Sequence, residues 1–323
     1  MSLLTRYLTD AHRAELSKRV TANGIRLEDV IRSGLRHPDS SVGVYAPDSQ
    51  SYEVFRELFG PILQNFRAPS WRHCGDLACL NRAAVVSTRI RMARNLAGHV
   101  FPAGMARSER LCVEEKIAQA CLGLAPDFEG TVTPLQHLQQ GRLDAMITQR
   151  LAFGPGDKYM AAAGIHADWP AGRSIFHTPD RQLSVWINEE DHLRVAVVMP
   201  GACAHDCYRV MGSVMSRLAA RLDFCTDAQL GFLTSCPSNA GSAMRASYMV
   251  DLPVDASQEP RLERLARAGV IQLRGAAGEH APRTGGHADV SFRNRVGVPD
   301  TQMLQDMEML FGDASGKAAP PLT

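Results

Sequence analysis

The chain has 323 residues, of which 45% are hydrophobic, and its formal net charge is +1 at pH 7. This length accommodates a small and a larger domain with a sizeable core. The near-zero charge argues against a nucleic-acid-binding or membrane-surface protein, since both usually carry a strong basic excess.

Membrane insertion and secretion are not expected from the pattern. No segment approaches the roughly 18 uninterrupted apolar residues of a membrane helix, and charged residues interrupt the first residues of the chain, where a signal peptide would have its apolar core. The eight cysteines follow no disulfide rhythm and lack the C-x2-C spacing of zinc sites. We therefore expect a cytoplasmic protein without a metal held by its own side chains.

The first part of the chain is predicted to be a small helical domain, residues 1–66. Apolar residues recur at helical spacing from Leu16 to Leu35, with Asp10 as the N-cap, and a second helix is predicted over 51–65, interrupted at Pro61. An irregular loop, 37–50, separates the two helices. Residues 67–81 have the composition of a linker.

Residues 82–312 are predicted to form the larger domain. Strands are expected at 85–91, 183–187, 193–199, 230–235, 244–252 and 270–273, and helices at 108–121, 262–268 and 301–311. Short turns join 183–187 to 193–199, and a loop at 236–243 joins the next pair, so two hairpins are predicted. This mixture indicates an α+β fold with a largely antiparallel sheet flanked by helices, followed by a disordered tail, 313–323.

Several arginines stand on or beside predicted strands. Strand periodicity places Ser87, Arg89 and Arg91 on one face and Val86, Thr88 and Ile90 on the other. Further arginines begin a strand or open a loop: Arg194, Arg245 and Arg274. The planar guanidinium fork suits phosphate oxygens, so a polyanion site is one interpretation. A set of unrelated surface arginines is the other, and pattern alone leaves both open.

The turn between the two strands of the first hairpin is acidic. Glu189, Glu190 and Asp191 precede Arg194 closely. Carboxylates beside an anion-binding arginine would serve a reaction that joins an anion to a cation, although an ordinary solvated turn has the same composition. Neither a Walker A segment nor a G-x-G-x-x-G loop is present.

Separate segments resemble the phosphagen (guanidino) kinase family, and arginine kinases in particular, in order and spacing. They are 42–48 (VGVYAPD), 87–91 (STRIR), 169–173 (WPAGR), 188–194 (NEEDHLR), 231–239 (GFLTSCPSN), 244–247 (MRAS), 274–275 (RG) and 278–280 (GEH). The resemblance covers about residues 3–311. It implies reversible transfer of the γ-phosphoryl group of MgATP to a small guanidino acceptor, most simply L-arginine.

The resemblance also assigns roles. It implies a phosphate clamp made of Arg89, Arg91, Arg194, Arg245 and Arg274, with Ser87 at the nucleotide. It implies that Glu190 and Glu279 grip the guanidinium, with Glu190 as base, and that Cys236 is a reactive thiol with a lowered pKa. The acceptor loop would contribute Ser40, Ser41, Val42 and Tyr45. Mg²⁺ would arrive with the nucleotide, and the protein would be a monomer or homodimer.

The chain departs from arginine kinases at several positions. Arg150 and Met249 stand where histidines commonly lie on the adenine side, Ser41 replaces a glycine, and the segment 67–80 is short. These differences leave room for taurocyamine or another guanidine as acceptor. A protein-arginine kinase shares the catalytic motifs but lacks the small N-terminal domain. A nucleotide-binding pseudoenzyme would usually have lost at least one of the chemical groups present here.

Overall fold

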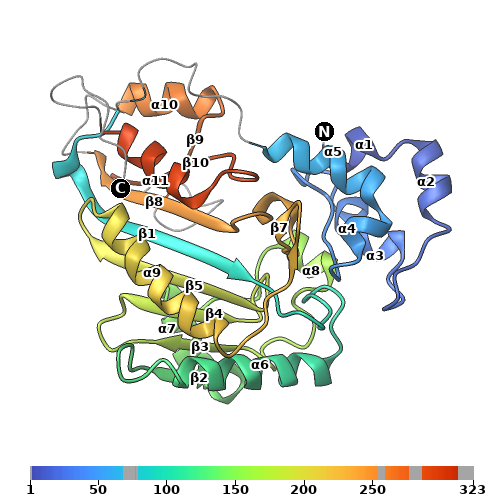
Figure 1. Cartoon of the computed structure of the whole chain (residues 1–323), viewed down its shortest axis with the longest axis horizontal. Coiled ribbons are helices and arrows are strands. Elements are labelled where there is room, and N and C mark those ends of the chain that lie inside the picture. The colour runs from blue at the N-terminus through green and yellow to red at the C-terminus, as the bar shows by residue number, and fades with distance from the viewer. Residues whose placement is uncertain (1, 68–76, 78, 253–258, 276–285, 312–323) are drawn as a thin grey trace.

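The computed structural model describes residues 2–67, 77, 79–252, 259–275 and 286–311. Its N-terminal part is helical and lies at one end of the molecule (Figure 1). The helices are α1 (Leu3–Tyr7), α2 (Asp10–Leu16), α3 (Leu27–Arg36), α4 (Ser51–Val54) and α5 (Arg56–Phe66). They bury one apolar cluster that includes Val30, Ile31, Phe55 and Phe59.

The expected helix through residues 16–35 is wrong in its first half. The chain leaves helix at Leu16 and re-enters it at Leu27, because Gly24 adopts a left-handed φ of 80° and closes a turn. Thr9, rather than Asp10, caps α2 by accepting a hydrogen bond from the His12 backbone N–H. The predicted second helix is present, but it breaks at Phe55 and continues through Pro61.

The larger part is built on an eight-stranded sheet in the order β2-β3-β4-β5-β1-β8-β10-β9. Every neighbouring pair is antiparallel. The strands are β1 (Val85–Arg94), β2 (Thr131–Pro134), β3 (Ser174–His177), β4 (Leu183–Ile187), β5 (Leu193–Pro200), β8 (Met244–Asp251), β9 (Ile271–Gly275) and β10 (His287–Phe292). The predicted α+β class with a mainly antiparallel sheet flanked by helices is confirmed.

Helices cover one face of this sheet and bury its apolar side chains. They are α6 (Arg107–Leu122), α9 (Ala204–Ala219), α10 (Glu259–Arg267) and α11 (Asp300–Met309). In Figure 1, α9 crosses in front of β1 and β5, and α6 runs below β2 and β3. Ile90, Val195 and Tyr248 point into this core and are fully buried.

Among the described residues, helix α7 (Gln140–Thr148) covers the opposite face at the β2–β4 end. There α7 packs Leu143 against Ile175, in a cluster that Trp186 joins. Another helix, α8 (Lys158–Ala163), contacts α3 of the N-terminal part. The face of β5, β1, β8, β10 and β9 that looks away from the α9 layer therefore carries the polar side chains described below.

Two strand predictions need correction. The segment 230–235 does not form a hairpin with 244–252, because β7 (Gly231–Phe232) pairs with β6 (Thr226–Asp227) in a separate small sheet, whereas β8 pairs with β1 and β10. Val86 does not share the burial of Thr88 and Ile90. It is 48% exposed and lies at a register shift between Val85 and Ser87.

Candidate active site

The arginines that the sequence singled out project from one face of the sheet and come from four strands, β5, β1, β8 and β9. Arg91 lies directly opposite Arg245 in the β1–β8 register and opposite Ala196 in the β1–β5 register, two residues from Arg194. Side chains paired across an antiparallel ladder share a face. Arg274 of β9 pairs with Asp289 of β10, which pairs with Met249 of β8, and Met249 pairs with Ser87.

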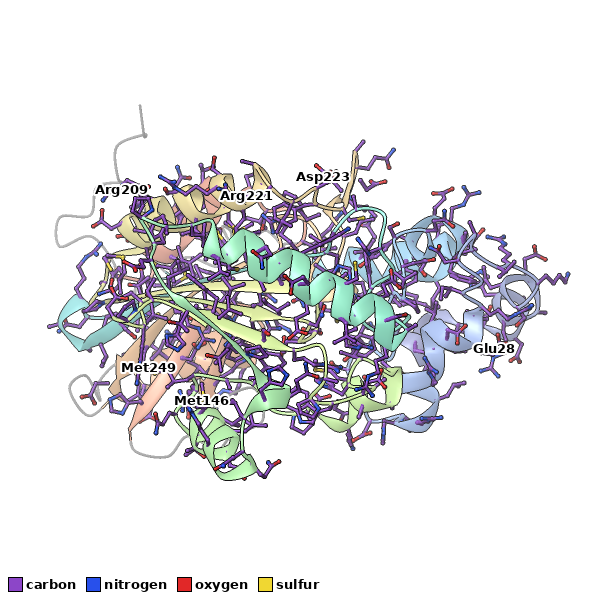
Figure 2. All side chains as sticks on the ribbon, turned by 90° about the horizontal axis from the view of Figure 1, so that it is seen from below. Glu28, Met146, Arg209, Arg221, Asp223 and Met249 are labelled. Atoms are coloured by element: carbon purple, nitrogen blue, oxygen red, sulfur yellow. The ribbon has the colours of Figure 1, made fainter. Side chains whose placement is uncertain are left out.

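We call this group the arginine face: Ser87, Arg89, Arg91, Arg194, Arg245 and Arg274. It lies on the side of the sheet away from α9. Figure 2 shows the two sides, with Arg209 of α9 on one and Met249 of β8 on the other. The strand register therefore brings these arginines together on one face and does not disperse them over the surface.

Mutual repulsion and burial act strongly on these arginines. Burial lowers the pKa of Arg91 well below its usual value, and the neighbouring Arg89, Arg245 and Arg194 lower it further. Burial also lowers the pKa of Arg89, whose Nε is buried and has no hydrogen-bond partner within the described chain. Neither Arg89 nor Arg91 forms an ion pair with any described residue. Half-buried guanidinium groups that repel one another and form no ion pair are costly, so the arrangement favours binding of a polyanion.

Asp289 is a buried carboxylate on the arginine face. Arg245 Nη2 lies 2.5 Å from Asp289 Oδ1, and Arg245 Nε donates to Ser291 Oγ at 3.0 Å. Although burial acts to raise it, the pKa of Asp289 is lowered because Arg245, Arg89 and Arg91 surround it. Sequence analysis missed this residue. A single acidic residue between the apolar positions of the alternating segment 287–292 is the signal that could have revealed it.

The acidic turn closes one end of the arginine face. Arg194 Nη2 lies 2.8 Å from Glu189 Oε2 and 3.1 Å from Glu190 Oε2. The turn is fixed by Asn188, which adopts φ 56° and is fully buried. Its Nδ2 donates to the backbone oxygens of Arg110 and Gly172, so Glu190 stands on a rigid support.

Cys236 lies close to the same turn. Asn239, in the 3-10 turn Pro237–Asn239 that follows it, donates through Nδ2 to Glu190 Oε2 at 3.4 Å, and Cys236 Sγ is 3.1 Å from Ser238 Oγ. The expected low pKa of this thiol is wrong. Burial, and next the Glu190 carboxylate, raise the pKa of Cys236 to about 12. The charges that act on this thiol are those of Glu190 and Asp191, and both are acidic.

The expected acceptor loop meets Cys236. Val42 and Tyr45 pack in one apolar cluster with Cys236 and Met160 of α8, and the Ala46 backbone N–H donates to the Ser235 oxygen at 2.7 Å. Ser40 is buried, and its Oγ accepts from the Gly43 backbone N–H at 3.0 Å, which shapes the loop. Ser41 is exposed, and its carbonyl accepts from the Leu3 backbone N–H.

Three further positions were singled out in the sequence: Glu279, Arg150 and Met249. Glu279 falls within 276–285, outside the described residues. Arg150 follows α7 with φ 60° and is exposed, and its charge contributes to lowering the pKa of Arg89. Met249 faces the same side as Ser87. Both departures from the arginine kinase pattern thus lie toward the Arg89–Ser87 end of the arginine face, away from Glu190.

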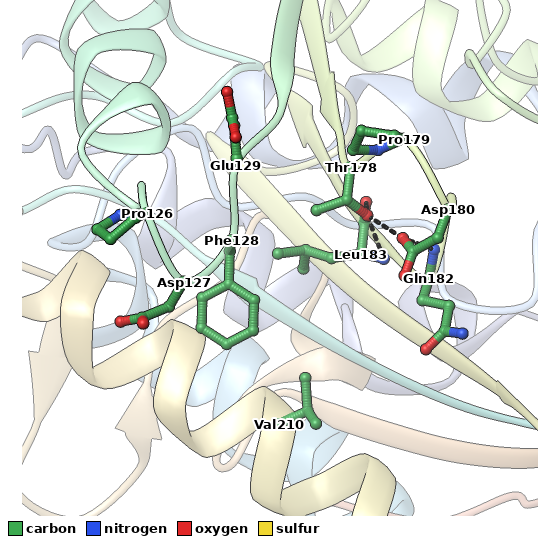
Figure 3. Close-up of a pocket in the computed structure, with 10 residues that line it drawn as sticks. All are labelled: Pro126, Asp127, Phe128, Glu129, Thr178, Pro179, Asp180, Gln182, Leu183 and Val210. Carbon is green, nitrogen blue, oxygen red and sulfur yellow. Dashed lines mark hydrogen bonds between the residues drawn. The ribbon is translucent and has the colours of Figure 1, made fainter.

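A hollow of about 480 Å³ lies elsewhere, on the α9 side of the sheet. Figure 3 shows it between Phe128, Leu183 and Val210 of α9, with Thr178 bonded to Asp180 at its rim. Leu183 points to the helix-covered face, because it pairs with the buried Val197. This hollow is therefore separate from the arginine face.

Comparison with known proteins identifies the family. The N-terminal domain model of the ATP:guanido phosphotransferases matches residues 1–64, and the C-terminal catalytic domain model matches residues 112–312. The arginine kinase of Procambarus clarkii is 34% identical over 95% of this chain and 89% of its own length. The arginine kinase of Anthopleura japonica is 36% identical over 95% of this chain, which spans only 45% of that relative's length.

Solved structures agree with these matches. Lombricine kinase superimposes with a TM-score of 0.81 at 28% identity, covering 95% of this chain and 88% of the other. The duplicated taurocyamine kinase of Schistosoma mansoni, with bound transition-state-analogue components, gives 0.84 at 30% identity, covering 96% and 46%. Within the described residues, no helix is long and apolar enough to cross a membrane. The chain belongs to the ATP:guanido phosphotransferases, enzymes that transfer phosphate to a guanidino nitrogen.

Proposed function

We propose that the chain transfers the γ-phosphoryl group of MgATP reversibly to a guanidinium nitrogen of L-arginine, giving phosphoarginine and ADP. The observation that carries this proposal is the placement of the arginine face beside Glu190, Cys236 and the acceptor loop. This face of the sheet is strongly cationic, and the turn at one end of it is acidic. Such a polarity suits a reaction between a polyanion and a cation.

On this proposal, the arginines bind the nucleotide phosphates. The transition state of phosphoryl transfer is loose and carries its charge on the equatorial oxygens, so catalysis comes mainly from positioning and charge neutralisation. Arg91, Arg194 and Arg245 lie nearest the Glu190 turn and would hold the transferred group. Arg89 and Ser87 lie farther along β1 and would hold the rest of the nucleotide.

The acceptor requires a base, because a guanidinium is protonated at neutral pH. A carboxylate can hold the planar group and take one N–H proton as the N–P bond forms. Glu190 stands beside Arg194, and so beside the phosphate end, and we assign it this role. We keep Glu279 as the second carboxylate by resemblance alone. Cys236 would contact the guanidino group without becoming a covalent nucleophile.

Phosphagen kinases use MgATP in general, and the residues here fit that complex. Mg²⁺ prefers oxygen ligands and keeps several waters when it arrives with a nucleotide. Among the described residues, no three His, Cys, Asp or Glu side chains gather into a metal site. Glu189 offers a carboxylate beside Arg194, so it would face the water shell of a nucleotide-bound Mg²⁺, which supplies charge neutralisation on the phosphates.

L-arginine is our first acceptor because the similar enzymes are mostly arginine kinases, and the acceptor loop keeps Val42 and Tyr45 against Cys236. Lombricine and taurocyamine are the alternatives, since structural neighbours act on them by name. A cytoplasmic location, a monomeric or homodimeric state and the domain limits 1–66 and 82–312 stay part of the proposal.

A coupled ADP-release assay tests the acceptor. It compares arginine, taurocyamine, lombricine, glycocyamine and creatine at saturating MgATP, and we expect the highest kcat/KM with arginine. A higher kcat/KM with another guanidine would reassign the acceptor. Labelling of an unfolded protein from radioactive ATP, with free arginine ignored, would indicate a protein-arginine kinase. Calorimetric binding of nucleotide without turnover of any guanidine would indicate a pseudoenzyme.

A further inference from the structure

One buried carboxylate joins the turn that carries Glu190 to the loop that carries Cys236. Asp191 is 1% exposed. Its Oδ1 accepts from Asn95 Nδ2 at 2.7 Å and from the Ser235 backbone N–H at 2.6 Å. Asp191 directly follows Glu190, and Ser235 directly precedes Cys236, so a single oxygen atom links the two residues that would meet the guanidino group.

Asn95 completes this link from the position that follows β1. It is fully buried and follows β1 directly. Its Oδ1 accepts from the His192 backbone N–H at 2.8 Å, and its Nδ2 also donates to the Leu233 oxygen at 3.2 Å. The Asn95 amide is thus bonded to the acidic turn on one side and to the Cys236 loop on the other.

The N-terminal helical part is attached to the same loop. Tyr52 donates from its hydroxyl to the Thr234 oxygen at 2.7 Å, and the Ala46 N–H of the acceptor loop donates to the Ser235 oxygen at 2.7 Å. Thr234 and Ser235 are fully buried. Ser235 therefore receives the acceptor loop through its carbonyl and Asp191 through its N–H.

Burial of this carboxylate is costly, which argues that its position matters. Asp191 Oδ2 is buried and has no hydrogen-bond partner within the described chain, and burial raises the pKa of Asp191. A buried acid that lacks a full set of partners destabilises the fold unless its remaining bonds are strong. Hydrogen bonds to an ionised carboxylate are about twice as strong as neutral ones.

We propose that Asp191 and Asn95 are positioning residues that fix Glu190 and Cys236 relative to each other and to the acceptor loop. The proposal rests on the proposed function for the roles of Glu190 and Cys236. Its expected signature is selective: loss of the link should disturb the guanidino acceptor and leave the nucleotide in place, because the strand register holds the arginine face.

Steady-state kinetics of Asp191→Ala and of the isosteric Asp191→Asn test this. The alanine variant should lower kcat/KM for the acceptor at least about thirtyfold, since it removes two charge-assisted hydrogen bonds. The asparagine variant keeps an acceptor oxygen and should lower it about three- to tenfold. The calorimetric Kd for MgATP should stay within about threefold in both, because the strand register positions the arginines.

Asp306→Asn is the matched control. Asp306 is also 1% exposed and accepts a side-chain hydrogen bond, from Gln302 Nε2 at 2.9 Å, but it lies in α11 on the helix-covered face. Its replacement should leave the ratio of acceptor kcat/KM to nucleotide affinity unchanged. Equal losses for acceptor and nucleotide in the Asp191 variants, or no change in acceptor kcat/KM, would overturn the proposal.

A second measurement does not depend on turnover and so separates this inference from the proposed function. Cys236 is 7% exposed, and iodoacetamide labelling at Cys236 can be followed by peptide mass spectrometry. Release of the Ser235–Asp191 bond and removal of the neighbouring charge should speed labelling at least about fivefold in Asp191→Ala, but not in Asp306→Asn. An unchanged rate would refute the link even if the parent enzyme phosphorylates arginine, whereas a parent that phosphorylates no guanidine would refute the function alone.

Discussion

Arg91 of β1 and Arg245 of β8 are register partners, so two guanidinium groups leave adjacent strands on the same side of the sheet. Arg245 is bonded to Asp289, whereas Arg91 has no ion pair with a described residue. The guanidinium groups on this face therefore repel one another, and the Asp289 carboxylate offsets part of this repulsion. Binding of a polyphosphate would relieve the rest.

Replacement of Asp289 by Asn should leave the repulsion between these arginines without its compensating carboxylate. Removing one partner of a buried ion pair costs about 3 kcal/mol, so the Tm without ligand should fall by roughly 5–10 °C. Tripolyphosphate should raise the Tm more in the variant than in the parent, because the uncompensated arginines gain more from an anion. Scanning calorimetry with and without the anion measures both. An equal anion effect in the two proteins would contradict the interpretation.

The pH dependence of the same ion pair has a defined sign. Because the pKa of Asp289 is lowered in the folded protein, its contribution is present above the ordinary value of 3.8 and is lost as the pH falls through the lower folded value. Below that range, the unfolding free energies of the parent and Asp289→Asn should converge. Urea unfolding across the acidic range checks this.

Loss of Arg274 should weaken the transition state. Arg274→Ala should lower kcat/KM by about 10²–10³, as removal of one preorganised donor does in other enzymes. Arg209→Ala provides the control, because Arg209 is exposed on α9, on the opposite side of the sheet. A kcat/KM for Arg274→Ala equal to that of the control would exclude the clamp role.

Glu190→Gln should separate chemistry from nucleotide binding. We expect kcat to fall by about 10²–10⁴, the usual range for loss of a general base. Arg194 would keep its contact with Glu189 at 2.8 Å, so the Kd for MgATP should change little. Glu189→Gln should affect kcat less. If Glu190→Gln no longer binds nucleotide in calorimetry, its role is in the clamp and the base must be sought elsewhere.

Cys236 should be a slow thiol in the ligand-free enzyme. With a pKa near 12, very little thiolate is present at pH 8, and the thiolate is the reactive form. Alkylation at pH 8 should be slower at Cys236 than at the exposed Cys112, and its rate should still rise with pH above 9. A rate plateau near neutral pH would restore the low-pKa thiol expected from the sequence.

His166 should contribute to acid sensitivity. It is 9% exposed, neither ring nitrogen has a hydrogen-bond partner among the described residues, and burial lowers its pKa to about 4. A lowered folded pKa means that stability is full above the ordinary value of 6.5 and is lost as the pH falls toward 4, by about 3 kcal/mol. His166→Leu should flatten this part of the pH–stability curve in urea titrations. An unchanged slope would mean that His166 is solvated.

The sequence predicted the parts of the fold that are governed by local pattern. The hairpin of β4 and β5 was found because alternating residues flank a polar turn, and the shared face of Arg89 and Arg91 follows from strand periodicity alone. The pairing of β8 was not found. Its partners, β1 and β10, are distant in sequence, and adjacency to 230–235 suggested a hairpin that does not form.

The candidate site also has a part that the sequence predicted and a part that it did not. Motif order identified the arginines and Glu190, but the charge state of Cys236 depends on burial and on Glu190, which the sequence places 46 positions away. Asp289 and Asn95 lacked any motif of their own. Each acts through side chains that only the sheet register or the meeting of two loops brings close.

The construction of the cationic wall from adjacent strands has an evolutionary consequence. Deleting or inserting one residue inside β1 would turn Arg89 and Arg91 toward the apolar layer, since a one-residue slip reverses every side chain. Two charges would then be buried there without partners. Insertions and deletions in related proteins should therefore be rare within the β-strands. They should occur mainly in the loops that connect the strands.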